Sequence, residues 1–437
     1  RSTLFPYTTL FRSYLYLSIS MNSSIIKAAF AYILSSFCVQ GVAFASQLLL
    51  MRWFSVSQYG EYALAFEALA VCNLVINGAF RNYYLKSIRD GIDYQDLLSY
   101  QLLFGSLWCG VAGVIVALLF KIEFSISVAI CISMVLSSLF LPVNMEYLAK
   151  GRKWRLIIRD VFNSISTLAL SFLLIKLGFQ EAKPFIFSVL LSQVVVNFIV
   201  FFRFRYLKRI LNFTLIKNVK LSIIPFFGVF IVNTIYNKLG VTFVNLKLGI
   251  VDVAVYLAAF KFITPFYAVQ AALISAVMPK FTSAEKFKFN CSFFMFFALP
   301  GAIASILLIL LFPTMISIFS LHKYDGLFYL MKYAGVVIFV VFIYGALSNY
   351  IAVNGGQKYI IITNVAGVVF YSALLCLGTF YAPENNLLVF SIGFFVITEC
   401  IVCILYYFNL RKSHDITFLF LLSPILIIIY ESYMLMA

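Results

Sequence analysis

The chain has 437 residues, of which 63% are hydrophobic and only 11% are charged. A soluble domain is typically about 45–50% apolar and about 25% charged, so this composition excludes a water-soluble globular protein and indicates an integral membrane protein. The formal net charge is +16. The basic residues lie in short segments between apolar stretches, where they orient helices and contact anionic membrane lipids, and no basic face or known module indicates nucleic-acid binding.

The first 20 residues are set apart from the rest of the chain. The segment RSTLFPYTTLFRS, residues 1–13, resembles a translated sequencing adaptor, and Met21 begins a segment that reads as a natural start. We therefore expect 1–20 to be a non-native leader and exclude it from reasoning about the fold.

Twelve apolar stretches follow, and each has about the 20 residues that a helix needs to cross a bilayer. They lie at 25–50, 60–80, 97–120, 124–144, 157–178, 184–202, 221–246, 252–279, 292–319, 331–353, 358–380 and 386–408. A last apolar stretch within 411–437, at 416–436, is either a thirteenth span or an interfacial tail, and Glu431 leaves both open. The prediction is an all-α integral membrane protein with about twelve transmembrane helices.

Basic residues collect in every second loop. The loops after the even-numbered spans contain Arg81, Lys86, Arg89, Lys150, Arg152, Lys153, Arg155, Arg203, Arg205, Lys208, Arg209, Lys217, Lys220, Lys280, Lys286, Lys288, Arg411 and Lys412. The other loops are poor in basic residues. Since positive loops stay in the cytoplasm, the charge pattern predicts a multi-pass protein with a cytoplasmic amino terminus. We expect it to lie in the bacterial inner membrane.

A short internal repeat suggests two halves. YALAFE at 62–67 in the second span aligns with YLAAFK at 256–261 in the eighth, and each follows a short outer loop with a glycine, Gly60 or Gly249. Six spans separate the copies, so both point the same way across the membrane, as in a parallel-repeat transporter. We expect a six-helix lobe at 21–202, a basic cytoplasmic linker at 203–220 and a second six-helix lobe at 221–410, around a central cavity.

Ionisable residues at bilayer depth are functional candidates because inserting each costs about 2.5–3.5 kcal/mol or more. Lys261 and Glu67 occupy equivalent repeat positions. Both can face a central cavity, where Lys261 attracts an anionic substrate and Glu67 couples to a cation or balances charge. The alternative is a structural pair, or a lysine that snorkels to the headgroups.

Five further candidates have polar or charged side chains on the predicted helices. Asn233, Asn237 and Lys238 share one face by their i, i+4, i+5 spacing and suit sugar hydroxyls or phosphate, although such residues also hold helices together. Glu399 lies near the middle of the twelfth span, where a carboxyl group can carry a coupling proton or form a neutral internal bond. Arg81 ends the span that contains Glu67 and could meet a diphosphate.

Other chemistries lack their signatures. Most of the eight cysteines lie in apolar stretches, and Cys400-x-x-Cys403 has no βαβ context that would indicate redox chemistry. Two histidines cannot build a typical metal or catalytic site, and no G-x-x-x-x-G-K-[ST] phosphate loop is present. We therefore predict a transporter rather than an enzyme, without a cofactor or metal.

Several segments resemble one family of membrane transporters. FSVSQYGEY at 54–62, Leu248-Gly249 with Tyr256 to Lys261 and Pro279, and NGGQK at 354–358 resemble elements of polysaccharide biosynthesis membrane proteins. These are the O-antigen (Wzx-type) and exopolysaccharide flippases of the multidrug/oligosaccharidyl-lipid/polysaccharide (MOP) superfamily. The resemblance covers the chain from about Met21 to Leu410. Relatives often have an acidic–basic pair in the seventh span, where this chain has Asn237-Lys238.

The resemblance implies a flippase that moves an undecaprenyl-diphosphate-linked oligosaccharide, an O-antigen, capsule or exopolysaccharide repeat unit, from the cytoplasmic to the periplasmic leaflet. Transport would proceed by alternating access, driven by a proton or sodium gradient. A polysaccharide polymerase and a chain-length regulator would be partners in lipopolysaccharide or capsule assembly. The alternatives are a drug/cation antiporter of the same superfamily and a membrane glycan polymerase.

Overall fold

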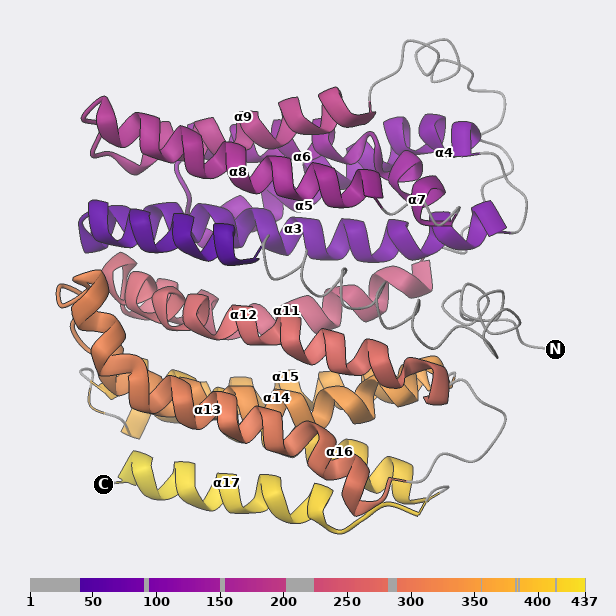
Figure 1. Cartoon of the computed structure of the whole chain (residues 1–437), viewed down its shortest axis with the longest axis vertical. Helices are drawn as coiled ribbons and strands as arrows, with labels where there is room; N and C mark the ends of the chain where they lie inside the picture. Colours follow the sequence, from indigo (N-terminus) through magenta and orange to yellow (C-terminus); the bar gives the residue numbers. More distant parts are fainter. Residues whose placement is uncertain are drawn as a thin grey trace. The chain divides into compact units, whose positions relative to one another are not determined.

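The computed structural model describes residues 40–89, 94–149, 154–201, 224–281, 289–354, 356–381, 383, 386–412 and 415–436. The expected leader 1–20, most of the expected first span and the linker 203–220 lie outside these residues. The described part is helical apart from turns and one isolated β-bridge (Figure 1), which confirms the all-α class. The chain divides into two compact units, Gly41–Thr234 and Ile235–Ala437, here called the amino-terminal and carboxy-terminal units.

The amino-terminal unit is built around one long helix, α3. After a helix at 40–53 come α3 (Val56–Arg89), α4 (Tyr94–Tyr100), the π-helical turn η2 (Gln101–Gly105), α5 (Ser106–Phe120), α6 (Phe124–Ser138), α7 (Leu141–Ala149), α8 (Trp154–Lys176) and α9 (Ala182–Phe201). Helix α3 packs against α5, α6, α7 and α9, and α9 also packs against α6 and α8. Large apolar side chains such as Leu118 and Phe124 remain exposed, as expected where the solvent is lipid.

Helix α3 differs at both ends from the predicted second span. It begins at Val56 because the Ser55 hydroxyl accepts a hydrogen bond from the Gln58 backbone N–H at 3.2 Å and so caps the helix. Gly60 is therefore helical, and the expectation that it lies in an outer loop is wrong. At the other end the helix continues past Arg81 to Arg89, because arginine and lysine are good helix formers once the chain has left the hydrocarbon region.

Helix α11 (Ile224–Lys247) contains the boundary between the two units. It turns sharply into α12 (Ile250–Phe281) at Gly249, whose φ of 109° is a conformation that L side chains rarely adopt. The Gly249 N–H donates to the Val244 carbonyl at 3.2 Å and closes the end of α11. The predicted glycine turn before the eighth span is confirmed here.

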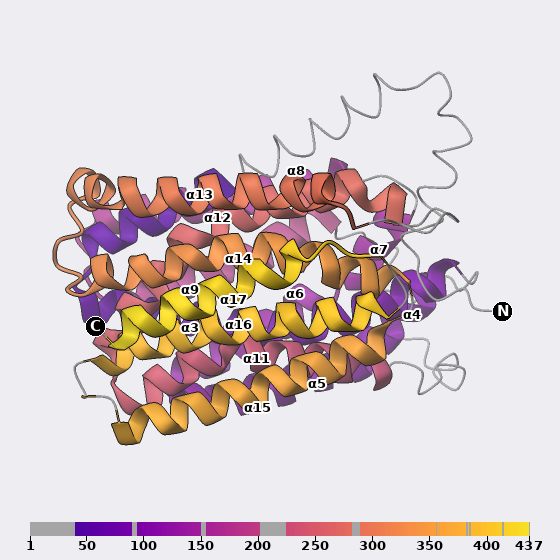
Figure 2. The same ribbon diagram turned by 90° about the horizontal axis from the view of Figure 1, so that it is seen from below.

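The rest of the carboxy-terminal unit surrounds α14 and α16. It comprises α13 (Cys291–Phe319), α14 (Leu327–Val353), α15 (Gln357–Tyr381), α16 (Leu387–Arg411) and α17 (Leu419–Met436). Helix α14 packs on α12, α13 and α16, and α16 packs on α15 and α17 (Figure 2). A parallel bridge between Phe289 and Ile416 joins the start of α13 to the chain before α17.

Nine helices in the described residues are long and apolar enough to cross a membrane. They correspond to the predicted third to sixth and eighth to twelfth spans, while α3 and α11 occupy the second and seventh. The total of about twelve stays a prediction. The thirteenth apolar stretch is the shorter helix α17, in which Glu431 is completely buried.

Candidate functional site

Glu399 lies at the centre of the carboxy-terminal unit. It is near the middle of α16, and only 1% of it is exposed. The hydroxyl groups of Tyr236 on α11 and Tyr344 on α14 are close enough to interact with its carboxyl group. Tyr267, Tyr371 and Tyr406, on α12, α15 and α16, also interact with it electrostatically. Five helices thus contribute to one carboxyl–tyrosine cluster.

Hydrogen bonds and ring contacts position the tyrosines of this cluster. Tyr371 donates its hydroxyl hydrogen to the Ser391 carbonyl at 2.8 Å, and Tyr406 donates to Asn364 Oδ1 at 3.3 Å. The rings of Tyr344 and Tyr406 are stacked with their centroids 6.5 Å apart. Because each buried hydroxyl otherwise loses its solvation, these partners favour one arrangement of the rings.

Glycines allow the surrounding helices to approach this cluster. A Cβ at Gly240 on α11 would collide with the hydroxyl groups of Tyr256 and Tyr371. A Cβ at Gly367 on α15 would lie 2.9 Å from the ring of Tyr236. Larger residues at these two positions would move the tyrosine hydroxyls away from their observed places.

The Glu399 carboxyl group lacks a charge partner among the described residues. Among the described residues, neither oxygen of Glu399 forms a hydrogen bond of standard geometry, in spite of the nearby hydroxyls, and no basic side chain forms an ion pair with it. A buried carboxylate without a charge partner is costly, which makes Glu399 a candidate to bind a proton or a cation. The described residues contain no group of three or more His, Cys, Asp or Glu side chains that could hold a metal ion.

The other predicted residues lie on the helices expected of them. Asn233, Asn237 and Lys238 follow one another on the unbroken helix α11, where Asn233 and Lys238 are half-buried and Asn237 is exposed. Lys261 is half-buried on α12 between Tyr256 and Tyr267 of the same helix. Their contact with a substrate stays a prediction.

Glu67 and Arg81 both lie on α3, with Glu67 buried and Arg81 exposed. Fourteen residues of helix place them about 21 Å apart along its axis, so they cannot form a pair with each other. Glu67 belongs to the amino-terminal unit and Lys261 to the carboxy-terminal unit. The predicted pairing of these two residues across a cavity stays a prediction.

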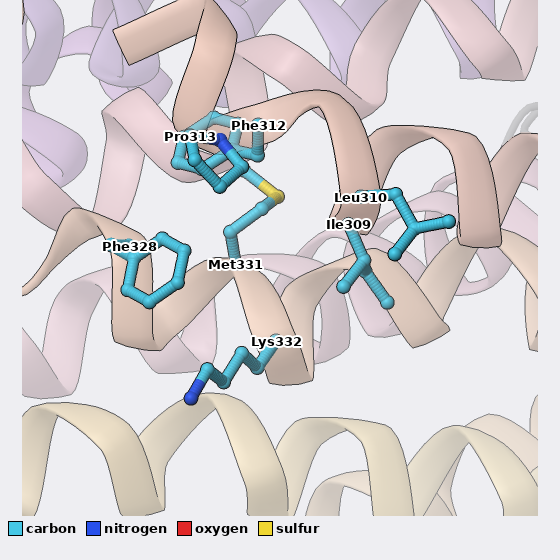
Figure 3. A pocket seen from close by; sticks show the side chains of 7 residues that line it. All are labelled: Ile309, Leu310, Phe312, Pro313, Phe328, Met331 and Lys332. Carbon is cyan, nitrogen blue, oxygen red and sulfur yellow. The ribbon is translucent and has the colours of Figure 1, made fainter. Parts of the chain in front are cut away.

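An apolar cavity of about 250 Å³ lies between α13 and α14. Figure 3 shows Met331 between Phe328 and Ile309, with Lys332 at one side. The Lys332 ammonium group lies 5.2 Å from the ring centre of Phe328 and 5.3 Å from that of Tyr329. This lining suits hydrocarbon rather than a sugar or a diphosphate.

Glu399 was predicted from the sequence, but the tyrosines around it were not. Tyr236 adjoins the predicted Asn237-Lys238 pair and Tyr267 follows Lys261 by six residues, so both were within reach of the same argument. Tyrosine is abundant in this chain and is common at membrane interfaces. Its presence in a span therefore gave no signal until several helices were brought together.

Comparison with solved structures identifies proteins of similar fold, whereas comparison by sequence identifies no family. No family model matches the chain and no curated protein matches it. Among solved structures, the lipid II flippase MurJ in an inward closed conformation is similar over 93% of this chain and 98% of its own, with 13% identity and a TM-score of 0.62. A multidrug resistance MATE family transporter of the MOP superfamily, inward-facing, is similar over 86% and 96%, with 12% identity and a TM-score of 0.59.

The outward-facing structure described for a MATE family transporter of the same superfamily also matches, over 88% of this chain and 96% of its own, with 12% identity and a TM-score of 0.56. These structures are of transporters and a flippase rather than of enzymes. The chain therefore has the fold of MOP superfamily transporters, as its sequence motifs predicted. At this identity the likeness concerns the fold and leaves the substrate open.

Proposed function

We propose that this protein is a flippase that moves an undecaprenyl-diphosphate-linked oligosaccharide, the repeat unit of an O-antigen, capsule or exopolysaccharide, from the cytoplasmic to the periplasmic leaflet of the bacterial inner membrane. The observation that carries the proposal is the similarity in fold, over nearly the whole chain, to a flippase for a lipid. Alternating access between inward-open and outward-open states would move the headgroup, while the lipid tail stays in the bilayer.

The charges of the candidate residues agree with an anionic headgroup. Lys261, Lys238 and Arg81 are cationic, and ammonium and guanidinium groups bind phosphate oxygens through charge-assisted hydrogen bonds. Asn233 and Asn237 would hydrogen-bond to sugar hydroxyls. A polysaccharide polymerase and a chain-length regulator would receive the product on the periplasmic side.

Glu399 would couple transport to an ion gradient. Because its buried carboxyl group has no cationic partner among the described residues, binding or release of a proton or a sodium ion would change the charge inside the carboxy-terminal unit. Such a change can favour one of two packed states over the other when the ion binds them with different affinities.

A drug/cation antiporter is the second candidate because MATE family structures share the fold. Cation recognition needs carboxylates that are not already paired. In the described part of the amino-terminal unit, Asp160 is paired with Arg159 at 2.6 Å, and Glu67 is the buried acidic side chain. The flippase is therefore the better-supported function, and an enzymatic polymerase has no counterpart among these structures.

Deletion and complementation test the proposal. Loss of the gene should abolish the surface glycan, and the wild-type chain should restore it. Lys261→Ala should restore it poorly, because a diphosphate would lose a cationic partner. Lys176→Ala, which removes an exposed lysine at the end of α8, should restore it fully. Unchanged surface glycan after deletion would refute the flippase, and full rescue by Lys261→Ala would remove Lys261 from the site.

A further inference from the structure

A second cavity lies wholly within the amino-terminal unit and differs from the apolar one in its chemistry. It has a volume of about 220 Å³ and is lined by residues of α3, α6, α7, α8 and α9. Five of its lining side chains are amides, a set that we call the amide cavity: Asn73, Asn144, Asn163, Gln193 and Asn197. No predicted site residue belongs to it.

Several polar atoms of this cavity lack a partner in the described residues. Asn144 is only 6% exposed, and its Oδ1 accepts no hydrogen bond. Asn163 Oδ1 and the Ser137 hydroxyl, on the walls formed by α8 and α6, are likewise buried without a partner. Buried oxygens without donors cost free energy, so a ligand that supplies hydroxyl hydrogens would be stabilised here.

The lining residues that the structure describes carry no net charge. Arg159 and Asp160 are the charged residues among them, and the guanidinium group of Arg159 donates from Nε and Nη2 to the same carboxylate oxygen of Asp160 at 2.8 and 2.6 Å. A phosphate would need an excess of positive charge and a cation an excess of negative charge. Amide groups both donate and accept, and so do sugar hydroxyls, which makes a neutral polyhydroxyl group the best chemical match.

The size and position of the cavity agree with this match. A volume of 220 Å³ corresponds to about seven water molecules at roughly 30 Å³ each, enough for a single sugar ring but not for an oligosaccharide. Asn144, Asn163 and Asn197 lie near the ends of their spans that meet the basic loops. In the predicted orientation these are the cytoplasmic ends, where a flippase would collect its substrate.

We propose that the amide cavity binds one neutral sugar unit of the transported headgroup through hydrogen bonds from its hydroxyls to Asn144, Asn163 and Ser137. This inference deepens the proposed function and rests on it. The amino-terminal unit would then recognise the sugar, while Lys261, Lys238 and Arg81 would bind the diphosphate. Specificity would follow because a site built from buried amides rejects an analogue that lacks the matching hydroxyl.

Direct binding to the full-length protein in lipid nanodiscs tests the proposal. The probes are neutral methyl hexosides, methyl deoxyhexosides and methyl N-acetylhexosaminides, together with glucuronate and glucosamine as charged counterparts, and saturation-transfer NMR reports contact. At least one neutral sugar should bind, and the charged sugars should bind about tenfold more weakly or not at all. Binding by none of the neutral sugars would mean that the cavity holds water alone, and it would overturn the proposal.

Matched variants locate the binding. Asn144→Leu keeps the number and branching of the side-chain heavy atoms and removes the amide, and it should weaken binding about tenfold, the effect of about 1.4 kcal/mol. Asn163→Leu, on a different helix, should act in the same way and serves if Asn144→Leu does not accumulate. Asn349→Leu on α14, whose amide donates to the Gly345 carbonyl outside this cavity, should bind like the wild type. Equal binding by all three variants would refute the assignment.

The same variants separate this inference from the proposed function. If deletion of the gene abolishes surface glycan but Asn144→Leu and Asn163→Leu restore it as well as Asn349→Leu does, the flippase stands and the sugar site is wrong. If deletion leaves the glycan unchanged, the flippase is wrong, and sugar binding by the purified protein is then judged on the NMR result alone.

Discussion

Gly240 offers the sharpest test of the carboxyl–tyrosine cluster. Replacing it by alanine would put a methyl group against the hydroxyls of Tyr256 and Tyr371, with the Tyr256 Cζ 3.1 Å from the new carbon. Overpacking of a dense interior costs about 1–3 kcal/mol. Displacing Tyr371 would also weaken its hydrogen bond to the Ser391 carbonyl, which is worth about 0.5–1.5 kcal/mol.

One effect opposes this loss. Alanine favours a helix over glycine by about 1 kcal/mol, so the net destabilisation from Gly240→Ala should be about 0.5–3.5 kcal/mol. The assay is thermal unfolding of the detergent-solubilised protein, in which the apparent unfolding temperature should fall by a few degrees. Gly228→Ala on the same helix is the matched control, because a Cβ there meets nothing within 4 Å, and it should be neutral or slightly stabilising.

The cause can be checked by rescue. Tyr256→Phe removes one of the two hydroxyls that the new methyl group meets, so the double variant Gly240→Ala/Tyr256→Phe should be more stable than the two single changes predict when added. If Gly240→Ala is as stable as Gly228→Ala, or if the double variant shows no recovery, the helices around Glu399 do not pack as described.

Three further predictions concern transport, pH and topology. Glu399→Gln keeps the side-chain volume but removes the ionisable group, so transport in proteoliposomes should no longer respond to a pH or sodium gradient; an unchanged response would exclude Glu399 as the coupling residue. Glu123 lies in the loop before α6, 2.5 Å from the ammonium group of Lys183 at the start of α9. This ammonium group and the Ser125 hydroxyl lower the pKa of Glu123. A carboxyl group whose pKa is lower in the folded than in the unfolded chain stabilises the fold at pH values above its unfolded pKa. This stabilisation is lost as the pH falls through the pKa of the group in the folded state. Glu123→Gln should therefore lose slightly less stability on acidification than the wild type in thermal unfolding, and a steeper loss would contradict the pair. Glu181 lies just before α9, in a loop predicted to be periplasmic, and Lys412 follows α16 on the predicted cytoplasmic side. In a cysteine-free background, a membrane-impermeant maleimide added outside spheroplasts should label Glu181→Cys but not Lys412→Cys, and the reverse pattern would invert the predicted orientation.

The sequence alone determined the class of this protein and most of its helices. A chain with 63% hydrophobic residues cannot bury its apolar surface in water. The spacing of apolar stretches also located the nine helices in the described part of the chain that could span a bilayer. The degenerate motifs around Tyr59, Gly249 and Lys261 also indicated the fold that the comparisons support. Each of these signals is local, because a span is defined by consecutive residues.

Helix ends and side-chain partners depended on tertiary structure. Gly60 is helical because Ser55 caps α3, which begins at Val56, before the predicted start of the span at Gly60. The helix also continues beyond the predicted end of the span to Arg89. Hydropathy reports neither end of this helix. The tyrosines around Glu399 come from five helices, and the amide cavity from five others. A polar residue in an apolar stretch looks the same whether it faces a partner, a cavity or lipid. Only the packing of helices far apart in the chain decides which oxygens meet a donor and which are buried without one.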